Sequence, residues 1–176
     1  MIDITLENFE SDLIKDSIQQ PILLDIWAEW CGPCKSLGPV LEKLEVEYAG
    51  RFKLAKVNAD TQQEIAGQLS QMFGVRSIPF CVMFVGGQPV DGFVGALPEA
   101  KIREFLAKHV PSEGEIASEE ETLEAEEAAA AGDTETAVSK LLEALERDLI
   151  RRAGQGATEL QHITGPHAAR DWLTGR

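Results

Sequence analysis

Two cysteines separated by two residues form the most chemically distinctive motif of the chain. Cys31 and Cys34 flank Gly32 and Pro33 within the stretch Trp-Cys-Gly-Pro-Cys-Lys. An apolar strand pattern precedes the motif and a helical pattern follows it, so Cys31 should lie at a helix N-terminus, where unpaired amides and the helix dipole favour a thiolate. The thiolate is the form that attacks disulfides, and the spacing lets Cys34 reach Cys31 in turn. The motif predicts thiol–disulfide exchange.

A zinc site is the alternative interpretation of a Cys-x-x-Cys motif. His162 and His167 have the spacing of a zinc-finger pair, but they lie more than a hundred residues after the cysteines. Local spacing is what makes a zinc pattern informative, so redox chemistry is favoured, and we expect no metal and no cofactor. The third cysteine, Cys81, lies in an apolar run without cationic neighbours, which is typical of an inert core residue.

A lone acid interrupts the apolar run before the motif. Asp25 lies within residues 22–28, which are otherwise apolar, as in a strand that is buried on both faces. Burial disfavours the charged form of a carboxyl group, so we expect a raised pKa. Because shifted carboxylates concentrate at catalytic sites, a functional role is favoured. The alternative is an edge position hydrogen-bonded to water.

Hydrophobic spacing predicts the elements that hold these side chains. It indicates strands at residues 2–5, 22–28, 52–57, 79–85 and 90–94, and helices at residues 8–18, after Cys31, at 61–73 and at 97–110. A turn at Gly86-Gly87-Gln88 would join the last two strands as a hairpin. This alternation predicts an α/β domain with a mixed central sheet and helices on both faces.

Residues 1–110 resemble the thioredoxin family, and the matching motifs occur in the same order along the chain. The resemblance is carried by Trp-Cys-Gly-Pro-Cys-Lys at 30–35, with Asp25 before it and Pro39 after it. It continues through Lys-Val-Asn-Ala-Asp at 56–60, Gly-Val-Arg-Ser-Ile-Pro at 74–79 and Val-Gly-Ala-Leu at 94–97. The resemblance implies the thioredoxin fold and protein-disulfide reduction. The implied partners are disulfide-containing client proteins and a thioredoxin reductase.

The resemblance also implies catalytic roles. Cys31 and Cys34 would form the reversible disulfide. Asp25 would be a buried acid behind Cys34 that takes the proton of this cysteine as it attacks. Lys56 falls where thioredoxins place a lysine near that acid.

A substrate groove is implied in the same way. The peptide bond before Pro79 would be cis and would face the disulfide, and the neighbouring backbone would pair with an extended client peptide. The residues implied in substrate binding are Trp30, Gly32, Pro33, Ile78, Pro79 and Gly95. Phe80 departs from the family pattern, which usually has threonine there, and would change either the groove or only the packing.

The net charge of −14 is concentrated after the first domain. Residues 112–148 contain 13 acidic and two basic residues, a net charge of −11. An acidic surface repels nucleic acid and anionic membranes, so we expect neither as a partner. No apolar run approaches the ~20 residues that span a bilayer. The N-terminus does not resemble a secretory signal, so we expect a cytoplasmic protein.

The residues after 110 predict a helical appendage. We expect a linker at 111–118, a helical hairpin at 119–150 that is broken at Gly132-Asp133, and an irregular tail at 151–176. Small residues recur where the two helices would cross closely. Together with Leu141 they resemble one tetratricopeptide repeat, namely Ala125, Ala128, Gly132-Asp133, Ala137 and Ala144. The alternative is a generic hairpin rich in Glu and Ala.

The combination of a thioredoxin domain with such helices resembles the bacterial co-chaperonin thioredoxins, or chaperedoxins. Residues 35–39 and 86–93 also look like that branch. The resemblance implies that the redox domain protects client thiols while the helices bind unfolded clients or the chaperonin. Two functions are therefore open. One is a disulfide reductase linked to protein folding, and the other is a co-chaperone in which redox activity is secondary.

Overall fold

The computed structural model describes the backbone of residues 1–163 and, apart from Ser118, the side chains of residues 1–150. The chain divides into two compact units. The first extends from Met1 to Val110, and the second begins at Pro111. The cysteine motif belongs to the first unit, and the acidic segment belongs to the second.

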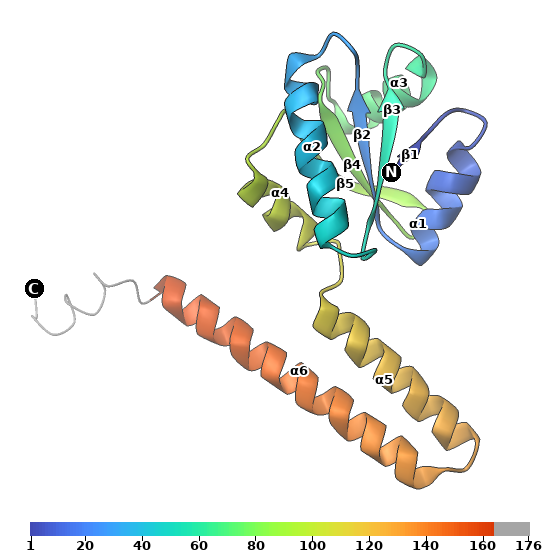
Figure 1. The fold of residues 1–176 in the computed structure, drawn as a ribbon, viewed down its shortest axis with the longest axis vertical. Helices are drawn as coiled ribbons and strands as arrows, with labels where there is room; N and C mark the ends of the chain where they lie inside the picture. The colour runs from blue at the N-terminus through green and yellow to red at the C-terminus, as the bar shows by residue number, and fades with distance from the viewer. Residues whose placement is uncertain (164–176) are drawn as a thin grey trace, which may run out of the picture. The chain divides into compact units, whose positions relative to one another are not determined.

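The first unit is built on a five-stranded mixed sheet with the strand order β1-β3-β2-β4-β5 (Figure 1). Strands β1 (Ile2–Asp3), β3 (Lys53–Asn58) and β2 (Ile22–Trp27) run parallel to one another. Strand β4 (Phe80–Val85) is antiparallel to β2, and β5 (Gln88–Val94) is antiparallel to β4. The central strand β2 is almost entirely apolar because both of its faces are covered.

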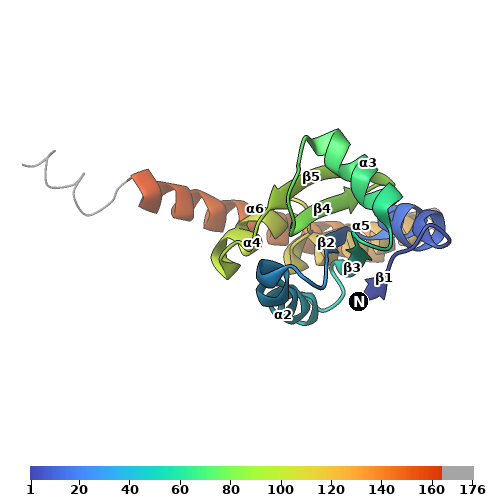
Figure 2. The same cartoon turned by 90° about the horizontal axis from the view of Figure 1, so that it is seen from above.

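Helices cover both faces of this sheet (Figure 2). One face packs against the π-helix η1 (Phe9–Lys15), α1 (Asp16–Gln19) and α3 (Gln63–Phe73), and the other against α2 (Gly32–Glu47) and α4 (Glu99–Leu106). Each face has its own apolar core, to which the helices contribute Leu13, Ile65 and Leu69 on one side and Leu37, Leu41, Leu44, Ile102 and Leu106 on the other. This arrangement confirms the predicted α/β class with a mixed sheet.

Two helices of the first unit differ from their predicted form. The segment predicted as one helix at 8–18 is a π-helix followed by a short α-helix. The helix predicted at 97–110 is α4, which ends at Leu106. The amides of Lys108 and His109 bond three residues back, to Phe105 and Leu106, so the chain continues in tight turns rather than in an α-helix.

The second unit is a hairpin of α5 (Glu113–Ala130) and α6 (Thr134–Ile163). A capping box begins α5, because the Ser112 hydroxyl accepts a hydrogen bond from the Glu115 amide while the Glu115 carboxylate accepts one from the Ser112 amide. Gly132, with a φ of +81°, makes the turn between the helices. Asp133 then accepts a hydrogen bond from the amide of Thr136.

Two predicted boundaries of the appendage are wrong. The linker expected at 111–118 ends before Glu113, because the capping box begins a helix there. The irregular tail expected at 151–176 is contradicted for residues 151–163, which continue α6. Isolated glycines cost a helix only about 1 kcal/mol each, and good helix formers surround the two glycines in this stretch. Residues 164–176 of the predicted tail lie outside the described residues.

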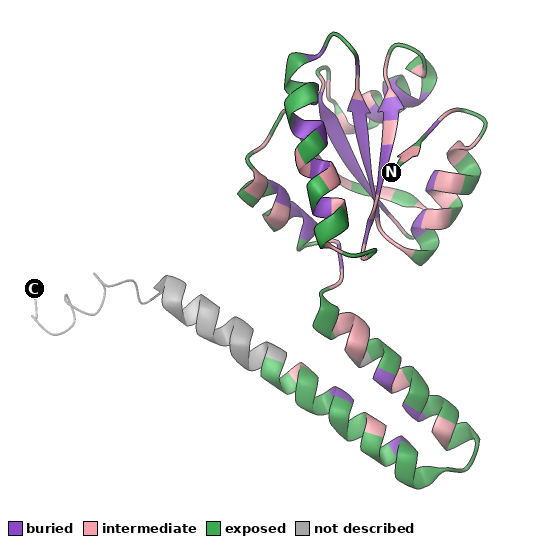
Figure 3. Ribbon diagram, viewed as in Figure 1, coloured by how far each residue is buried: buried purple, intermediate pink, exposed green. Residues whose placement is uncertain are grey.

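Small residues line the contact between α5 and α6. Ala125, Ala137 and Ala144 are buried there, and Glu121 Oε1 forms an ion pair with Arg147 at 2.8 Å across the hairpin. Up to residue 150, the large apolar side chains of α6 are exposed, namely Val138, Leu141, Leu142, Leu145, Leu149 and Ile150. Most residues in the described part of the hairpin are exposed (Figure 3). We call this group of six side chains the apolar face of α6.

Candidate active site

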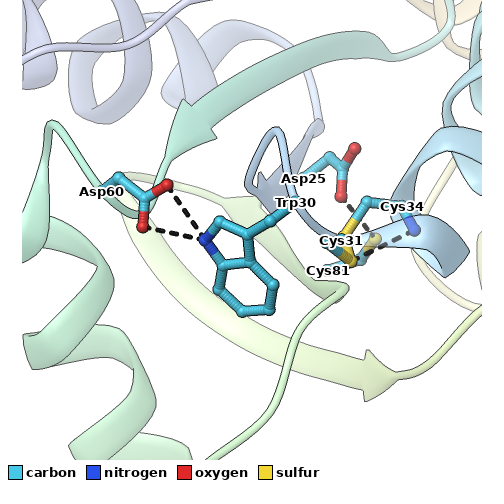
Figure 4. Close-up of a disulfide and its surroundings, with 6 residues drawn as sticks. All are labelled: Asp25, Trp30, Cys31, Cys34, Asp60 and Cys81. Atoms are coloured by element: carbon cyan, nitrogen blue, oxygen red, sulfur yellow. Dashed lines mark hydrogen bonds between the residues drawn. A yellow bond between two sulfur atoms is a disulfide. The ribbon is translucent and has the colours of Figure 1, made fainter.

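A disulfide joins Cys31 and Cys34 at the N-terminus of α2, just after β2 (Figure 4). Cys31 is the N-cap of the helix, and its sulfur accepts a hydrogen bond from the Cys34 amide at 3.2 Å. Pro33 fits the first turn because an amide there would have no partner within the helix. Both cysteines are almost fully buried. A helix-end amide is thus directed at the sulfur that would carry the negative charge of a thiolate.

A cavity of about 200 Å³ lies behind this disulfide. It is lined by Asp25, Trp27, Cys34, Lys35, Gly38, Pro39, Glu42 and Lys56. Asp25 is only 1% exposed, yet it shares this cavity with Cys34. Because polar groups line the space and it can hold water, a proton can pass between the carboxyl group and the thiol.

Burial sets the titration of the acid in this cavity. It raises the pKa of Asp25 from its ordinary value of 3.8 to about 6, against the opposing effects of the Lys56 charge and the Cys81 thiol. Lys56 is the register partner of Asp25 on β3, but its ammonium group forms its ion pair with Glu42 Oε1 at 2.8 Å. A carboxyl group that titrates near pH 6 can both accept and release a proton close to neutral pH.

The predicted groove residues differ in the contacts that they make. The Ile78–Pro79 peptide bond is cis, and Ile78 packs against the buried cysteine pair. The Gly95 amide donates a hydrogen bond to the Pro79 carbonyl at 2.8 Å. Trp30 is 71% exposed, and its indole N–H donates to both carboxylate oxygens of Asp60 at 3.1 and 3.2 Å (Figure 4). The sequence interpretation did not single out Asp60 as a partner of Trp30, although Asp60 closes the Lys-Val-Asn-Ala-Asp motif.

Phe80 belongs to the core rather than to the groove. It is 1% exposed and makes an edge-to-face contact with Phe73, with ring centroids 5.5 Å apart. Gly92 on β5 leaves room for it, since a Cβ there would lie 3.0 Å from a Phe80 ring carbon. Of the two predicted consequences of this departure, the structure favours the change in packing.

Cys81 is buried, as the sequence indicated, but it also contacts the acid of the site. Its Sγ donates a hydrogen bond to Asp25 Oδ1 at 3.7 Å, and the two residues are register partners on β4 and β2 (Figure 4). The sequence interpretation missed this contact. The available signal was that each residue is the polar member of an apolar strand, but the sequence pattern leaves the register between the two strands open.

The comparisons with known proteins agree with this geometry. The thioredoxin family model matches residues 1–108. Thioredoxin from Haemophilus influenzae is 46% identical over 103 residues, which cover 58% of this chain and 91% of that protein. Thioredoxin 1 from Nostoc sp. is 38% identical over 107 residues, which cover 61% of this chain and 94% of that protein. Thioredoxin from Chlorobaculum thiosulfatiphilum is 42% identical over 106 residues, which cover 60% of this chain and 93% of that protein.

The chain therefore belongs to the thioredoxin family, and its first unit has the thioredoxin fold. With the Cys31–Cys34 pair at the N-terminus of α2, the protein is a thiol–disulfide oxidoreductase. The family match ends at residue 108, before α5, so it does not bear on the helical hairpin.

The remaining sequence alternatives concern metals and membranes. Among the side chains that the structure describes, no group of three or more His, Cys, Asp or Glu residues could hold a metal ion. His162 and His167 lie outside those side chains. None of the helices in the described part of the chain is both long enough and apolar enough to cross a bilayer.

Proposed function

We propose that this protein is a protein-disulfide reductase that restores the thiols of client proteins by dithiol–disulfide exchange. The observation that carries the proposal is the environment of the two sulfurs. The Cys34 amide is directed at Cys31 Sγ at 3.2 Å, and Cys34 shares a cavity with the buried Asp25. The relatives that are named thioredoxins support the same activity.

In the proposed reaction the reduced protein is the reductant. The Cys31 thiolate attacks one sulfur of a client disulfide, so a bond forms between the two sulfurs, the client disulfide breaks, and the other client sulfur leaves and takes up a proton. Asp25 then accepts the proton of Cys34 as Cys34 Sγ attacks Cys31 Sγ. The second client sulfur leaves as a thiolate. Two electrons have passed to the client, and Cys31 and Cys34 form a disulfide.

Two partners follow from this cycle. The client presents an extended segment around its disulfide, and the surface beside Trp30, Gly32 and Pro33, together with Ile78, Pro79 and Gly95, would bind it. A thioredoxin reductase would supply the two electrons that return the Cys31–Cys34 disulfide to the dithiol. Both partners, and the residues that would bind the client, are proposed for this chain from its resemblance to the thioredoxin family.

The reductase proposal is tested by the reduction of insulin disulfides with dithiothreitol as the electron source. The full chain should accelerate reduction well above dithiothreitol alone, and a thioredoxin reductase with its own reductant should replace dithiothreitol. Cys31→Ser should abolish the acceleration, because the attacking thiolate is removed. Full activity of Cys31→Ser would overturn the proposal.

A second candidate function is that of a co-chaperone of the chaperedoxin type, which holds unfolded clients or docks on the chaperonin. The observation that favours it is the apolar face of α6, on which Val138, Leu142 and Leu145 are each more than half exposed. Contiguous exposed apolar side chains on a hairpin with a polar rim are typical of a binding surface. The strongly acidic rim would favour a basic patch on the partner.

This second function is tested separately from the first. The full chain should suppress the aggregation of a chemically unfolded client, and the triple variant V138Q/L142Q/L145Q should lose that effect. The same variant should reduce insulin at the rate of the unaltered protein, because the redox site belongs to the other unit. Unchanged suppression by the triple variant would exclude the apolar face of α6 as the binding surface.

A further inference from the structure

We propose that Cys81 is a positioning residue of the redox site, whose thiol holds the Asp25 carboxylate by an S–H hydrogen bond and so tunes its proton exchange with Cys34. The inference rests on the proposed function, in which Asp25 accepts the Cys34 proton. It gives the third cysteine of the chain a role that differs from both core filling and covalent redox chemistry.

The geometry of the contact carries the proposal. Cys81 Sγ lies 3.7 Å from Asp25 Oδ1, and both residues are buried. The two residues face each other in the antiparallel pairing of β2 and β4, so the backbone ladder holds the thiol beside the carboxylate. A weak donor to a buried carboxylate still matters, because burial of both groups strengthens the electrostatic interaction between them.

Cys81 stays a donor throughout the neutral pH range. Its own burial, together with the neighbouring Asp25 carboxylate, raises the pKa of the Cys81 thiol well above its ordinary value. The thiol therefore keeps its proton and is not a nucleophile. Its hydrogen bond stabilises the charged form of Asp25 and lowers the pKa of this acid, against the effect of burial.

Other titratable and charged groups near Asp25 also influence its pKa. The titratable and charged side chains that line its cavity or face Asp25 directly in the strand register are Cys34, Lys35 and Glu42 from α2, Lys56 from β3 and Cys81 from β4. Lys56 also lowers the pKa of Asp25, but its ammonium group is shared with Glu42. Without the thiol, Asp25 would hold its proton to a higher pH, so a smaller fraction of molecules could accept the Cys34 proton.

Three substitutions at Cys81 separate donor loss from changes in volume. Cys81→Val removes the donor and fills the site, Cys81→Ala removes the donor and leaves space, and Cys81→Ser keeps a donor. Met83→Leu is the matched control, since Met83 is buried on β4 in the same core cluster. Two measurements are made on each reduced full-length protein. These are the carboxyl ¹³C titration of Asp25 by NMR and the rate of insulin reduction from about pH 5 to 8.

The expected result is the same direction of change in both donor-removing variants. Cys81→Val and Cys81→Ala should move the Asp25 titration, and the acid limb of the rate profile, upward by about half a pH unit. Cys81→Ser and Met83→Leu should not move either curve upward. If one substitution prevents folding, the comparison of either remaining donor-free variant with Cys81→Ser still decides the question.

Three results would overturn part or all of the inference. If the Asp25 titration stays in place in the donor-free variants, Cys81 does not act on the acid. If Val and Ala move it in opposite directions, the effect is cavity hydration and the inference falls. If the titration moves while the rate profile does not, the contact stands, but the proposed role of Asp25 as the proton acceptor is wrong.

Discussion

At the scale of single residues, the two active-site cysteines differ in what surrounds each sulfur. Cys31 caps α2 and receives an amide hydrogen bond, whereas Cys34 lies one turn into the helix and lines the cavity that contains Asp25. We therefore propose that Cys31 attacks the client disulfide and that Cys34 resolves the mixed disulfide.

The assignment predicts different behaviour for two serine variants. Cys34→Ser should accumulate covalent adducts with a disulfide-containing client, because the mixed disulfide at Cys31 can no longer be resolved. Cys31→Ser should form none. Non-reducing electrophoresis with and without dithiothreitol measures this. Adducts that form only in the Cys31→Ser variant would reverse the roles.

The buried acid predicts a dependence of stability on pH. The pKa of Asp25 is about 6 in the folded protein and is ordinarily 3.8, so between these values the folded state binds more protons than the unfolded state. Stability from this group therefore falls as the pH rises through that window. Asp25→Asn should raise the free energy of unfolding by about 2 kcal/mol near pH 7 and by little near pH 4.

Urea unfolding of the oxidised proteins at the two pH values measures this difference. Asp25→Asn should also slow insulin reduction near neutral pH, because the proposed proton acceptor is lost. If Asp25→Asn raised the free energy of unfolding equally at both pH values, the destabilisation near pH 7 would not come from ionisation of the buried Asp25.

At the scale of elements, the pairing of β4 with β5 depends on Gly92. A Cβ at this position would lie 2.8 Å from the Cys81 carbonyl oxygen, which cannot move without disturbing the sheet. Gly92→Ala should therefore lower the free energy of unfolding by about 1–3 kcal/mol. Gly67→Ala is the control, since Gly67 lies within α3 with open space around it, and that change should stabilise by up to about 1 kcal/mol. Thermal unfolding of both variants tests the contrast, and equal effects would refute it.

At the scale of the whole molecule, the redox residues all belong to one unit. They lie between Asp25 and Gly95, and the apolar core beneath α2 and α4 includes Val110 at the end of that unit. In the part of the hairpin whose side chains are described, alanines and the ion pair of Glu121 with Arg147 join the two helices, and the apolar face of α6 is exposed. Chemistry and partner binding should therefore be separable.

A truncation to residues 1–110 should fold and reduce insulin at the rate of the full chain, but it should lose the suppression of client aggregation. In the full chain, that suppression should weaken as salt is raised, because the acidic hairpin contributes charge attraction to binding. Loss of reductase activity in the truncation, or full retention of holdase activity, would contradict this division of labour.

The sequence alone predicted the chemistry and the class of fold. Three local patterns carried these predictions: the Cys-x-x-Cys spacing, the apolar run that contains Asp25, and the alternation of strands and helices. Such patterns can be recognised in the sequence because each depends on residues that are close together along the chain. The linker predicted at 111–118 and the irregular tail predicted at 151–176 are helical at residues 113–118 and 151–163, because a capping box and helix-forming neighbours outweigh the local signals for a loop.

Tertiary structure alone decided which side chains face one another. Cys81 lies beside Asp25 although the two are 56 residues apart, because the register of β4 on β2 brings them together. Packing between elements that are distant in sequence also directs the Phe80 side chain into the core. It also leaves Leu142 exposed on the hairpin. The physical reason is that strand register and helix facing are set by the burial of whole faces, to which residues far apart in the chain contribute together.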